Sequence, residues 1–132
     1  MADYFTDFSF EIPVNATEIE KQTFINNWVD QAEDNEDYYG ALGLKATNTG
    51  IWVSSDGLVD DLEQALDFAV HALSHYGITV GIIVSWANTC SKPRLGSFGG
   101  GAALVTSDGI LDVCNPESEL RRLASENEIN LI

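Results

Sequence analysis

The stretch that decides the fold runs from Ile78 to Ser107 and reads ITVGIIVSWANTCSKPRLGSFGGGAALVTS. Its first half, Ile78–Cys90, is apolar on both faces, a pattern typical of a central strand. After a loop, residues 102–106 form a second apolar run. Ser107-Asp108-Gly109 follows, and its Asp-Gly pair is a strong hairpin signal. We therefore expect two strands here, separated by a basic, glycine-rich loop.

The chain before this stretch reads as a strand, a helix, a hairpin and a second helix. Residues 7–14 alternate between apolar and polar side chains, as a half-buried strand does. Asn15 with Glu18 indicates a helix start, and the apolar period of this helix continues to about Asp37. The two strands of the hairpin are expected at 42–46 and 51–53. The second helix is expected after a break at 54–57 and ends near Gly77.

After the stretch, Ile110–Val113 completes a hairpin, and Asn115-Pro116-Glu117 starts a short helix that runs to about Ser125. The resulting order is β-α-β-β-α-β-β-β-α. We expect one α+β domain over residues 1–132, with a ferredoxin-like β-α-β-β-α-β core at 7–90. A C-terminal β-hairpin and the short helix are added to this core. The sheet is expected to be largely antiparallel, with the helices on one face.

Acidity dominates the composition. The chain has 21 aspartates and glutamates but only 6 lysines and arginines, a net charge of −15. Residues 1–67 hold 15 of the acids, and their only bases are Lys21 and Lys45. Such a field repels nucleic acid and anionic membranes and steers the protein toward basic partners. Solubility and adaptation to a salty cytoplasm are alternative reasons for the same imbalance.

The chain lacks the features of export and of membrane insertion. No segment reaches the roughly 18 apolar residues of a membrane span, and Met1-Ala2-Asp3 opens without a basic region. We expect a cytoplasmic protein of the host cell. Cys90 and Cys114 are expected to be small buried thiols, since their spacing matches no zinc template. No cofactor is expected.

Acidic residues gather in two clusters, which are the candidate partner-binding site. They are Asp30, Glu33, Asp34, Glu36 and Asp37 in the first cluster, and Asp60, Asp61, Glu63 and Asp67 in the second. Neither cluster has the ligand spacing of an EF-hand. Their number, with so few lysines nearby, suggests a surface that imitates a phosphate backbone. The alternative is that both clusters are simply solvated faces.

The basic loop is a second candidate site, for an anion or a partner. It comprises Ser91, Lys92, Arg94, Gly99, Gly100 and Gly101. Lysine and arginine would supply charge, and glycines would let backbone N–H groups approach a phosphate. The order of residues is not that of a P-loop. The alternative is a structural loop whose glycines form a bulge, with Arg94 paired to a carboxylate of the same chain.

Catalytic and metal-binding motifs have little support. His71 and His75 share one helix face, but Ala72, Leu73 and Ser74 lie between them, so the His-Glu-x-x-His pattern is absent. We interpret the two histidines as a surface pair and expect no metal. No triad of serine, histidine and acid can be assembled from these patterns. The sequence therefore favours a protein that is not an enzyme.

Two short blocks carry a resemblance. Ser85-Trp86-Ala87-Asn88-Thr89-Cys90-Ser91-Lys92-Pro93-Arg94 with Phe98 to Gly101, and the opening Phe8 to Val14, resemble short acidic proteins carried by bacteriophages and plasmids. The resemblance implies a mobile-element protein that acts against host defence, as anti-CRISPR and anti-restriction proteins do. It implies no catalytic residues.

The leading hypothesis is a non-enzymatic, DNA-mimic-like inhibitor that binds a basic, nucleic-acid-binding protein of the host. It would contact no nucleic acid and no membrane directly. One alternative is a small enzyme or ligand-binding domain that uses the Lys92/Arg94 loop for an anionic ligand. Another is a homo-oligomeric structural protein, for which a homodimer through the loop or through the edge of the hairpin at 102–113 is one arrangement.

Overall fold

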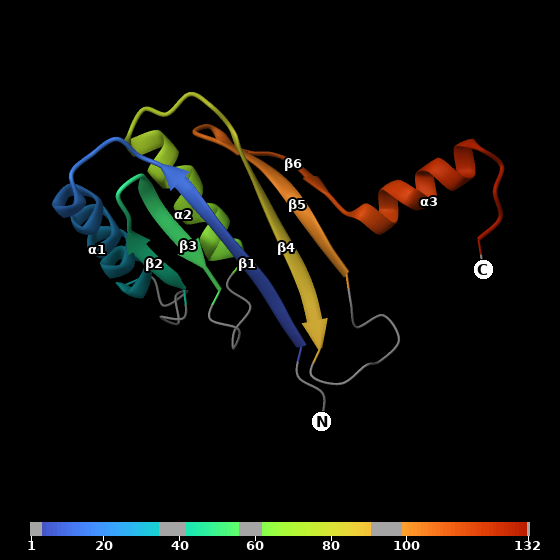
Figure 1. Ribbon diagram of the computed structural model, residues 1–132, viewed down its shortest axis with the longest axis horizontal. Coiled ribbons are helices and arrows are strands. Elements are labelled where there is room, and N and C mark those ends of the chain that lie inside the picture. Colours follow the sequence, from blue (N-terminus) through green and yellow to red (C-terminus); the bar gives the residue numbers. More distant parts are fainter. Residues whose placement is uncertain (1–3, 35–41, 56–61, 91–98, 132) are drawn as a thin grey trace.

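A computed structural model describes residues 4–34, 42–55, 62–90 and 99–131 (Figure 1). The predicted order of elements is confirmed over these ranges. The elements are β1 (Tyr4–Pro13), α1 (Glu18–Asp34), β2 (Gly43–Ala46), β3 (Gly50–Ser54), α2 (Leu62–His75), β4 (Ile82–Cys90), β5 (Gly99–Thr106), β6 (Gly109–Cys114) and α3 (Pro116–Glu126).

The described strands form one sheet in the order β2-β3-β1-β4-β5-β6, and every neighbouring pair is antiparallel. The α+β class and the antiparallel sheet are therefore confirmed. Strand β5 pairs with β4 along most of its length, so the predicted C-terminal hairpin extends the sheet. The strand order is thus that of a six-stranded sheet, which differs from the four-stranded ferredoxin-like core that the sequence predicts.

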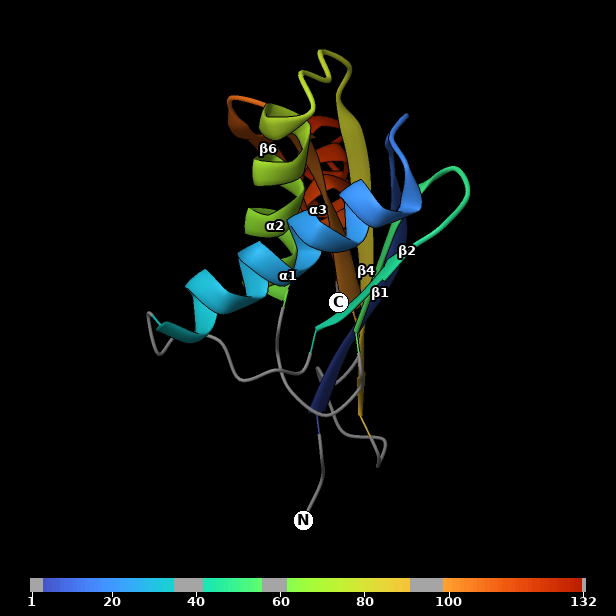
Figure 2. The same ribbon diagram turned by 90° about the vertical axis from the view of Figure 1, so that its left-hand side faces the viewer.

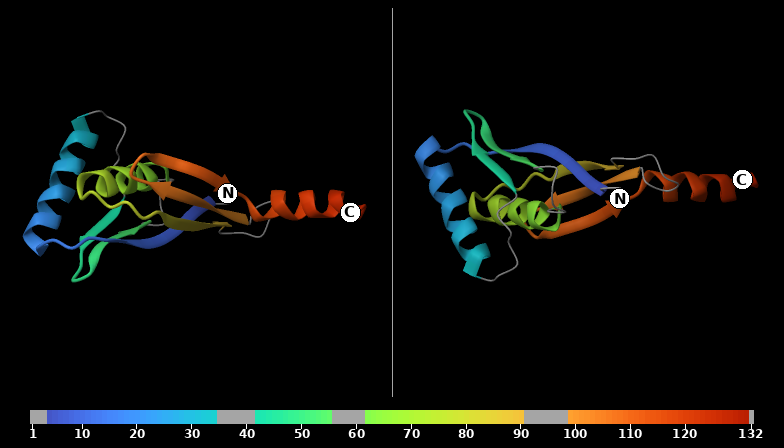
Figure 3. Two further views of the ribbon diagram at one scale, coloured as in Figure 1. Left: turned by 90° about the horizontal axis from the view of Figure 1, so that it is seen from above. Right: turned by 90° about the horizontal axis from the view of Figure 1, so that it is seen from below.

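Helices α1 and α2 lie on one face of the sheet (Figure 2), as expected. Helix α3 does not join them and projects from the end of the molecule opposite α1 (Figure 3). The local reason is that α3 starts as soon as β6 ends. The Asn115 side chain accepts hydrogen bonds from the backbone N–H groups of Glu117 and Ser118 and caps the helix there, as predicted. The chain has no loop in which to turn back over the sheet.

The core lies between the sheet and helices α1 and α2. The predicted alternation of the first strand is confirmed, because Phe8, Ile12 and Val14 are buried while Ser9 and Glu11 are exposed. The same core contains Ile51, Val53, Val84, Ala103 and Val105 from the other strands, and Ala65, Leu66, Phe68, Ala69, Ala72 and Leu73 from α2. None of the described helices lies over the opposite face of the sheet, and Ile83 on that face is 72% exposed.

Helix α1 begins with a capping box centred on Thr17, not with the expected cap at Asn15. The Thr17 hydroxyl accepts from the backbone N–H of Glu20 at 3.1 Å, and the Glu20 carboxylate accepts from the Thr17 N–H at 3.3 Å. This reciprocal pair matches the Thr-x-x-Glu signature, which lies two residues after Asn15. The predicted continuation of α1 from Glu36 to Asp37 falls outside the described residues.

Three strands begin three or more residues away from their predicted starts. Strand β1 begins at Tyr4, three residues early, and β4 begins at Ile82 instead of Ile78. Residues 78–81 instead belong to the connection that closes α2. Gly77 has a φ of +64° and the N–H of Ile78 donates to the carbonyl of Leu73. Strand β5 begins at Gly99 instead of residue 102.

Candidate functional site

The two helices that carry the predicted acidic clusters cross each other through aromatic side chains. The ring of Phe68 in α2 lies 5.2 Å from that of Trp28, edge to face, and 5.6 Å from that of Phe24. Phe24 also contacts the ring of His75 at 4.7 Å. Such ring pairs contribute about 0.5–1.5 kcal/mol each beyond the area that they bury. The crossing, which Figure 2 shows, therefore fixes α1 against α2.

Exposed carboxylates flank this crossing. Asp30 and Glu33 follow Trp28 on α1, while Glu63 and Asp67 precede Phe68 on α2, and all four are exposed. We call these four residues the α1–α2 acidic surface. The structure thus brings part of the first predicted cluster and part of the second onto the same pair of packed helices. Residues 30 and 67 come from distant parts of the chain, so this grouping depends on the fold.

The lysine of α1 does not neutralise this surface. Lys21 is only 2% exposed, and its Nζ donates a hydrogen bond of 2.7 Å to the carbonyl oxygen of Thr47, between β2 and β3. The ammonium group of Lys21 therefore lies on the side of α1 that faces the sheet. Sequence reasoning counted Lys21 as a base of the acidic half, and burial removes it from the surface. Neither α1 nor α2, both described along their whole length, offers an exposed lysine or arginine.

Two further acids extend the charge of α1 and were not among the predicted site residues. Glu18 and Glu20 are exposed at its first turn, where negative charge complements the helix dipole. Burial raises the pKa of the Tyr76 hydroxyl, and the charge of Glu20 raises it further. Their position in the first turn was the available signal, but it indicated a helix start and not a binding surface.

Several predicted site residues lie outside the described residues. These are Glu36, Asp37, Asp60, Asp61, Ser91, Lys92 and Arg94, together with the side chains of Asp34, Cys90 and Cys114. The described part of the acidic surface is therefore Asp30, Glu33, Glu63 and Asp67. The described part of the predicted loop site is its three glycines.

Those three glycines belong to a strand and not to a loop. Gly99, Gly100 and Gly101 form the start of β5 and pair with Asn88, Ala87 and Trp86 of β4. A Cβ on Gly100 would lie 2.5 Å from the carbonyl oxygen of Trp86, so the strands can approach here only because this residue is glycine. The assignment of the glycine run to the loop is wrong, and its described role is close strand pairing.

A cavity of about 730 Å³ adjoins this part of β5. Its walls come from β4, β5 and the start of α3, and the lining includes Trp86, Asn88, Gly99 and Leu120. Pockets of this volume commonly hold small molecules. The cavity lies beside both described ends of the segment that contains Lys92 and Arg94.

The two histidines of α2 are placed as expected. Both are exposed, and the Nε2 of His71 lies 3.5 Å from a carboxylate oxygen of Asp67. His75 instead contacts the rings of Phe24 and Tyr76. Among the described residues, no group of three or more histidine, cysteine, aspartate or glutamate side chains is arranged to hold a metal ion. None of the described helices is long and apolar enough to cross a membrane.

Comparisons with known proteins identified no relative of this chain. No protein-family model matches the chain, and neither a curated protein nor a solved structure matches it.

Proposed function

We propose that this chain is a non-enzymatic binding protein that docks its α1–α2 acidic surface on a basic, nucleic-acid-binding protein. One observation carries the proposal: two rigidly crossed helices present Asp30, Glu33, Glu63 and Asp67 to solvent without an exposed lysine or arginine on either helix. A fixed surface of one charge sign attracts a partner of the opposite sign and accelerates its binding. Nucleic-acid-binding proteins offer such surfaces, because they neutralise phosphates with lysine and arginine.

The biological setting proposed is that of a bacteriophage or plasmid protein acting in the cytoplasm of its host. There it would inhibit a defence system of the CRISPR or restriction type by occupying the nucleic-acid site. The resemblance of residues 8–14, 85–94 and 98–101 to mobile-element proteins supports this setting. Occupying a basic cleft requires carboxylates held at fixed positions, and the aromatic packing of α1 on α2 supports that requirement.

The proposal is tested by affinity capture from bacterial extract, with elution in steps of rising salt. The variant Asp30→Asn, Glu33→Gln, Glu63→Gln, Asp67→Asn keeps the shape of each side chain and removes four charges. We expect it to bind the captured protein roughly 10–100-fold more weakly, with a smaller dependence on salt. The captured protein should also release its DNA or RNA when the unmodified chain binds.

The matched control removes the same number of charges at the opposite end of the molecule. It is Glu117→Gln, Glu119→Gln, Glu126→Gln, Glu128→Gln, all exposed on or just after α3. The control should be captured like the unmodified chain, because its net charge changes equally but the α1–α2 acidic surface stays intact. Equal weakening of both variants would show that net charge alone governs binding, and unchanged capture of the first variant would refute the proposal.

A second candidate function is the binding of an anionic ligand beside the Lys92/Arg94 loop. The observation that favours it is the cavity of about 730 Å³ that the start of β5 and the start of α3 line. Pyrophosphate or a nucleoside triphosphate should then raise the melting temperature. The variant Lys92→Ala, Arg94→Ala should lose this shift, while Lys45→Ala, which changes an exposed lysine on β2, should keep it. This candidate is discarded if neither compound shifts the melting temperature of the unmodified chain.

We also propose that β1, α1, β2, β3, α2 and β4 form a ferredoxin-like unit to which β5, β6 and α3 are appended. The β-α-β-β-α-β order along the chain supports this view, as does the position of α1 and α2 on one face of the sheet. Under this view the acidic surface is the outer side of the helical layer, and the appended part is free for another role.

A further inference from the structure

Helix α3 makes few contacts with the rest of the described chain. It projects beyond the sheet (Figures 1 and 3), and Ala124 is its one buried side chain. It has 11 residues, and isolated helices shorter than about 12–15 residues are marginal in water. Its cap at Asn115 helps to start it, but helical stability in proteins comes mainly from packing of an apolar face. A surface that covers α3 would therefore stabilise it.

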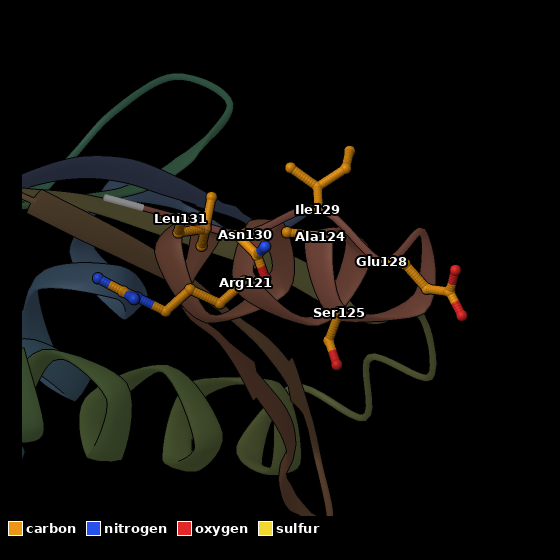
Figure 4. Close-up of a pocket in the computed structure, with 7 residues that line it drawn as sticks. All are labelled: Arg121, Ala124, Ser125, Glu128, Ile129, Asn130 and Leu131. Atoms are coloured by element: carbon orange, nitrogen blue, oxygen red, sulfur yellow. The ribbon is translucent and has the colours of Figure 1, made fainter.

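The exposed face of α3 is apolar. Leu120 is 65% exposed, and Leu123 is exposed beside it on the next turn. The chain after α3 folds back, because the N–H of Ile129 donates to the carbonyl of Ala124 at 2.8 Å. Asn130 and Leu131, labelled in Figure 4, belong to this tail and line pockets together with side chains of α3. Helix and tail together line a groove of about 430 Å³ that includes Leu120 and Leu131.

The flanks of α3 are almost neutral, unlike the rest of the molecule. The helix carries three glutamates and two arginines, and each arginine is paired within the helix. Arg121 lies 2.9 Å from Glu117, and Arg122 lies 2.9 Å from Glu119 and 2.7 Å from Glu126. The net charge of the helix is thus −1, against −15 for the chain. At α3, two copies of this acidic chain can approach each other with little repulsion.

Strand β6, which leads into α3, is an open edge of the sheet. It is last in the strand order, so within the described sheet its outer backbone groups have no strand partner. Leu111, at the register shift of β6, is 68% exposed, and Ile110 is exposed next to it. Open edges with apolar side chains are templates for pairing with another strand.

The face of the sheet away from α1 and α2 carries an apolar patch near the same edge. Ile83 of β4 pairs directly with Leu104 of β5, and both are exposed, as is Val80 before β4. The patch lies at the end of the sheet where β5 turns into β6, because Ile82 pairs with Val105. We call Val80, Ile83 and Leu104 the outer patch.

We propose that two copies of this chain form a two-fold dimer in which β6 pairs antiparallel with the partner's β6. Antiparallel pairing sets the end of β6, where α3 leaves, beside the start of β6 in the partner. Each α3 then reaches the outer patch of the other copy and packs its Leu120 face there. Such self-complementary contacts are the rule for two-fold dimers.

A second copy fits these surfaces because one pairing covers all of them. In a single copy, the open edge of β6, the apolar face of α3 and the outer patch are all uncovered. Antiparallel pairing of the two β6 strands covers the edge and also brings the apolar face of each α3 to the outer patch of the other copy. The apolar side chains that this pairing would cover are 39–72% exposed in a single copy, so their burial would favour the dimer. They are Val80, Ile83, Leu104, Leu111, Leu120 and Leu123. The α1–α2 acidic surfaces stay at the two far ends of the dimer, so this inference does not depend on the proposed function.

The test is the mass in solution by sedimentation equilibrium, between about 1 and 100 µM, concentrations at which a dimer of ordinary affinity is populated. We expect a dimer that is tighter at high salt, because salt screens the repulsion between two acidic copies. Capture of the basic partner should show the opposite salt dependence, so failure of one proposal is distinguishable from failure of the other.

Two variants locate the interface, and a third is their control. Leu120→Gln, Leu123→Gln leaves the charge unchanged and should weaken the dimer at least tenfold, as should Leu111→Lys at the edge of β6. Ile19→Gln, on the 80% exposed Ile19 of α1, should leave the dimer intact. A monomer across the whole range for the unmodified chain overturns the proposal, whatever other protein binds to α3. A dimer that both interface variants leave unchanged overturns it as well.

Discussion

Replacement of Phe68 by alanine is expected to lower the free energy of unfolding by about 3–5 kcal/mol. Phe68 is fully buried, and its ring contacts those of Trp28 and Phe24 where α2 crosses α1. Its removal leaves a cavity at the crossing, which the surrounding helices fill only in part. For a domain whose total stability is about 5–15 kcal/mol, the loss is a large share.

The measurement is equilibrium unfolding in urea, in which the midpoint should fall while the slope stays the same. Ile19→Ala is the matched control, since Ile19 is an apolar residue of α1 that is largely exposed. Its substitution should change stability by less than about 0.5 kcal/mol. A loss below about 1 kcal/mol for Phe68→Ala would contradict the view that this ring holds the two helices together.

The Phe68→Ala variant also connects stability with the proposed function. The α1–α2 acidic surface depends on the crossing, because its four carboxylates come from two helices that those rings join. A looser α1 should weaken capture of the basic partner even at temperatures where the variant is folded. The ordering of mobile carboxylates then opposes binding.

Replacement of Gly50 by alanine is expected to lower the free energy of unfolding by about 3 kcal/mol, the upper end for overpacking. Gly50 lies in β3 opposite Pro13 of β1. A Cβ here would overlap the carbonyl oxygen of Ile12 and lie 2.9 Å from its carbonyl carbon. Both atoms are backbone, and Ile12 pairs with Ile51 of β3, so β1 cannot move away here without disturbing its pairing with β3.

Gly99→Ala is the control for Gly50→Ala, because Gly99 is also a strand glycine. The nearest atom to its added Cβ is the Nδ2 of Asn88 at 3.7 Å, an ordinary contact with the end of a side chain. We expect thermal unfolding of Gly99→Ala to resemble that of the unmodified chain, while Gly50→Ala melts several degrees lower. Similar melting temperatures for the two variants would contradict this prediction. They would show that the β1 backbone can shift to accommodate the added methyl group.

The elements of this fold could be predicted where the signal was local. Alternation located β1, Asn115 located the start of α3, and Asp108-Gly109 located the β5–β6 hairpin. The acidity of α1 and α2 could also be predicted, from the count of charged residues. The start of α1 was predicted two residues early, because Thr17 and not Asn15 caps the helix. Each of these patterns depends on residues a few positions apart, which interact in the same way in most folds.

Other features depended on residues that are distant in sequence. Lys21 reads as a surface base of α1, but packing on the sheet buries it and gives its ammonium group the carbonyl of Thr47. The run Gly99–Gly101 reads as a loop, but it pairs with β4 because Gly100 lets the two backbones approach. Sequence by itself thus determined the elements and the acidity of this protein. Only the tertiary structure decided which carboxylates share a surface, which base is withdrawn from it and that α3 stands apart, because these outcomes follow from contacts between distant segments.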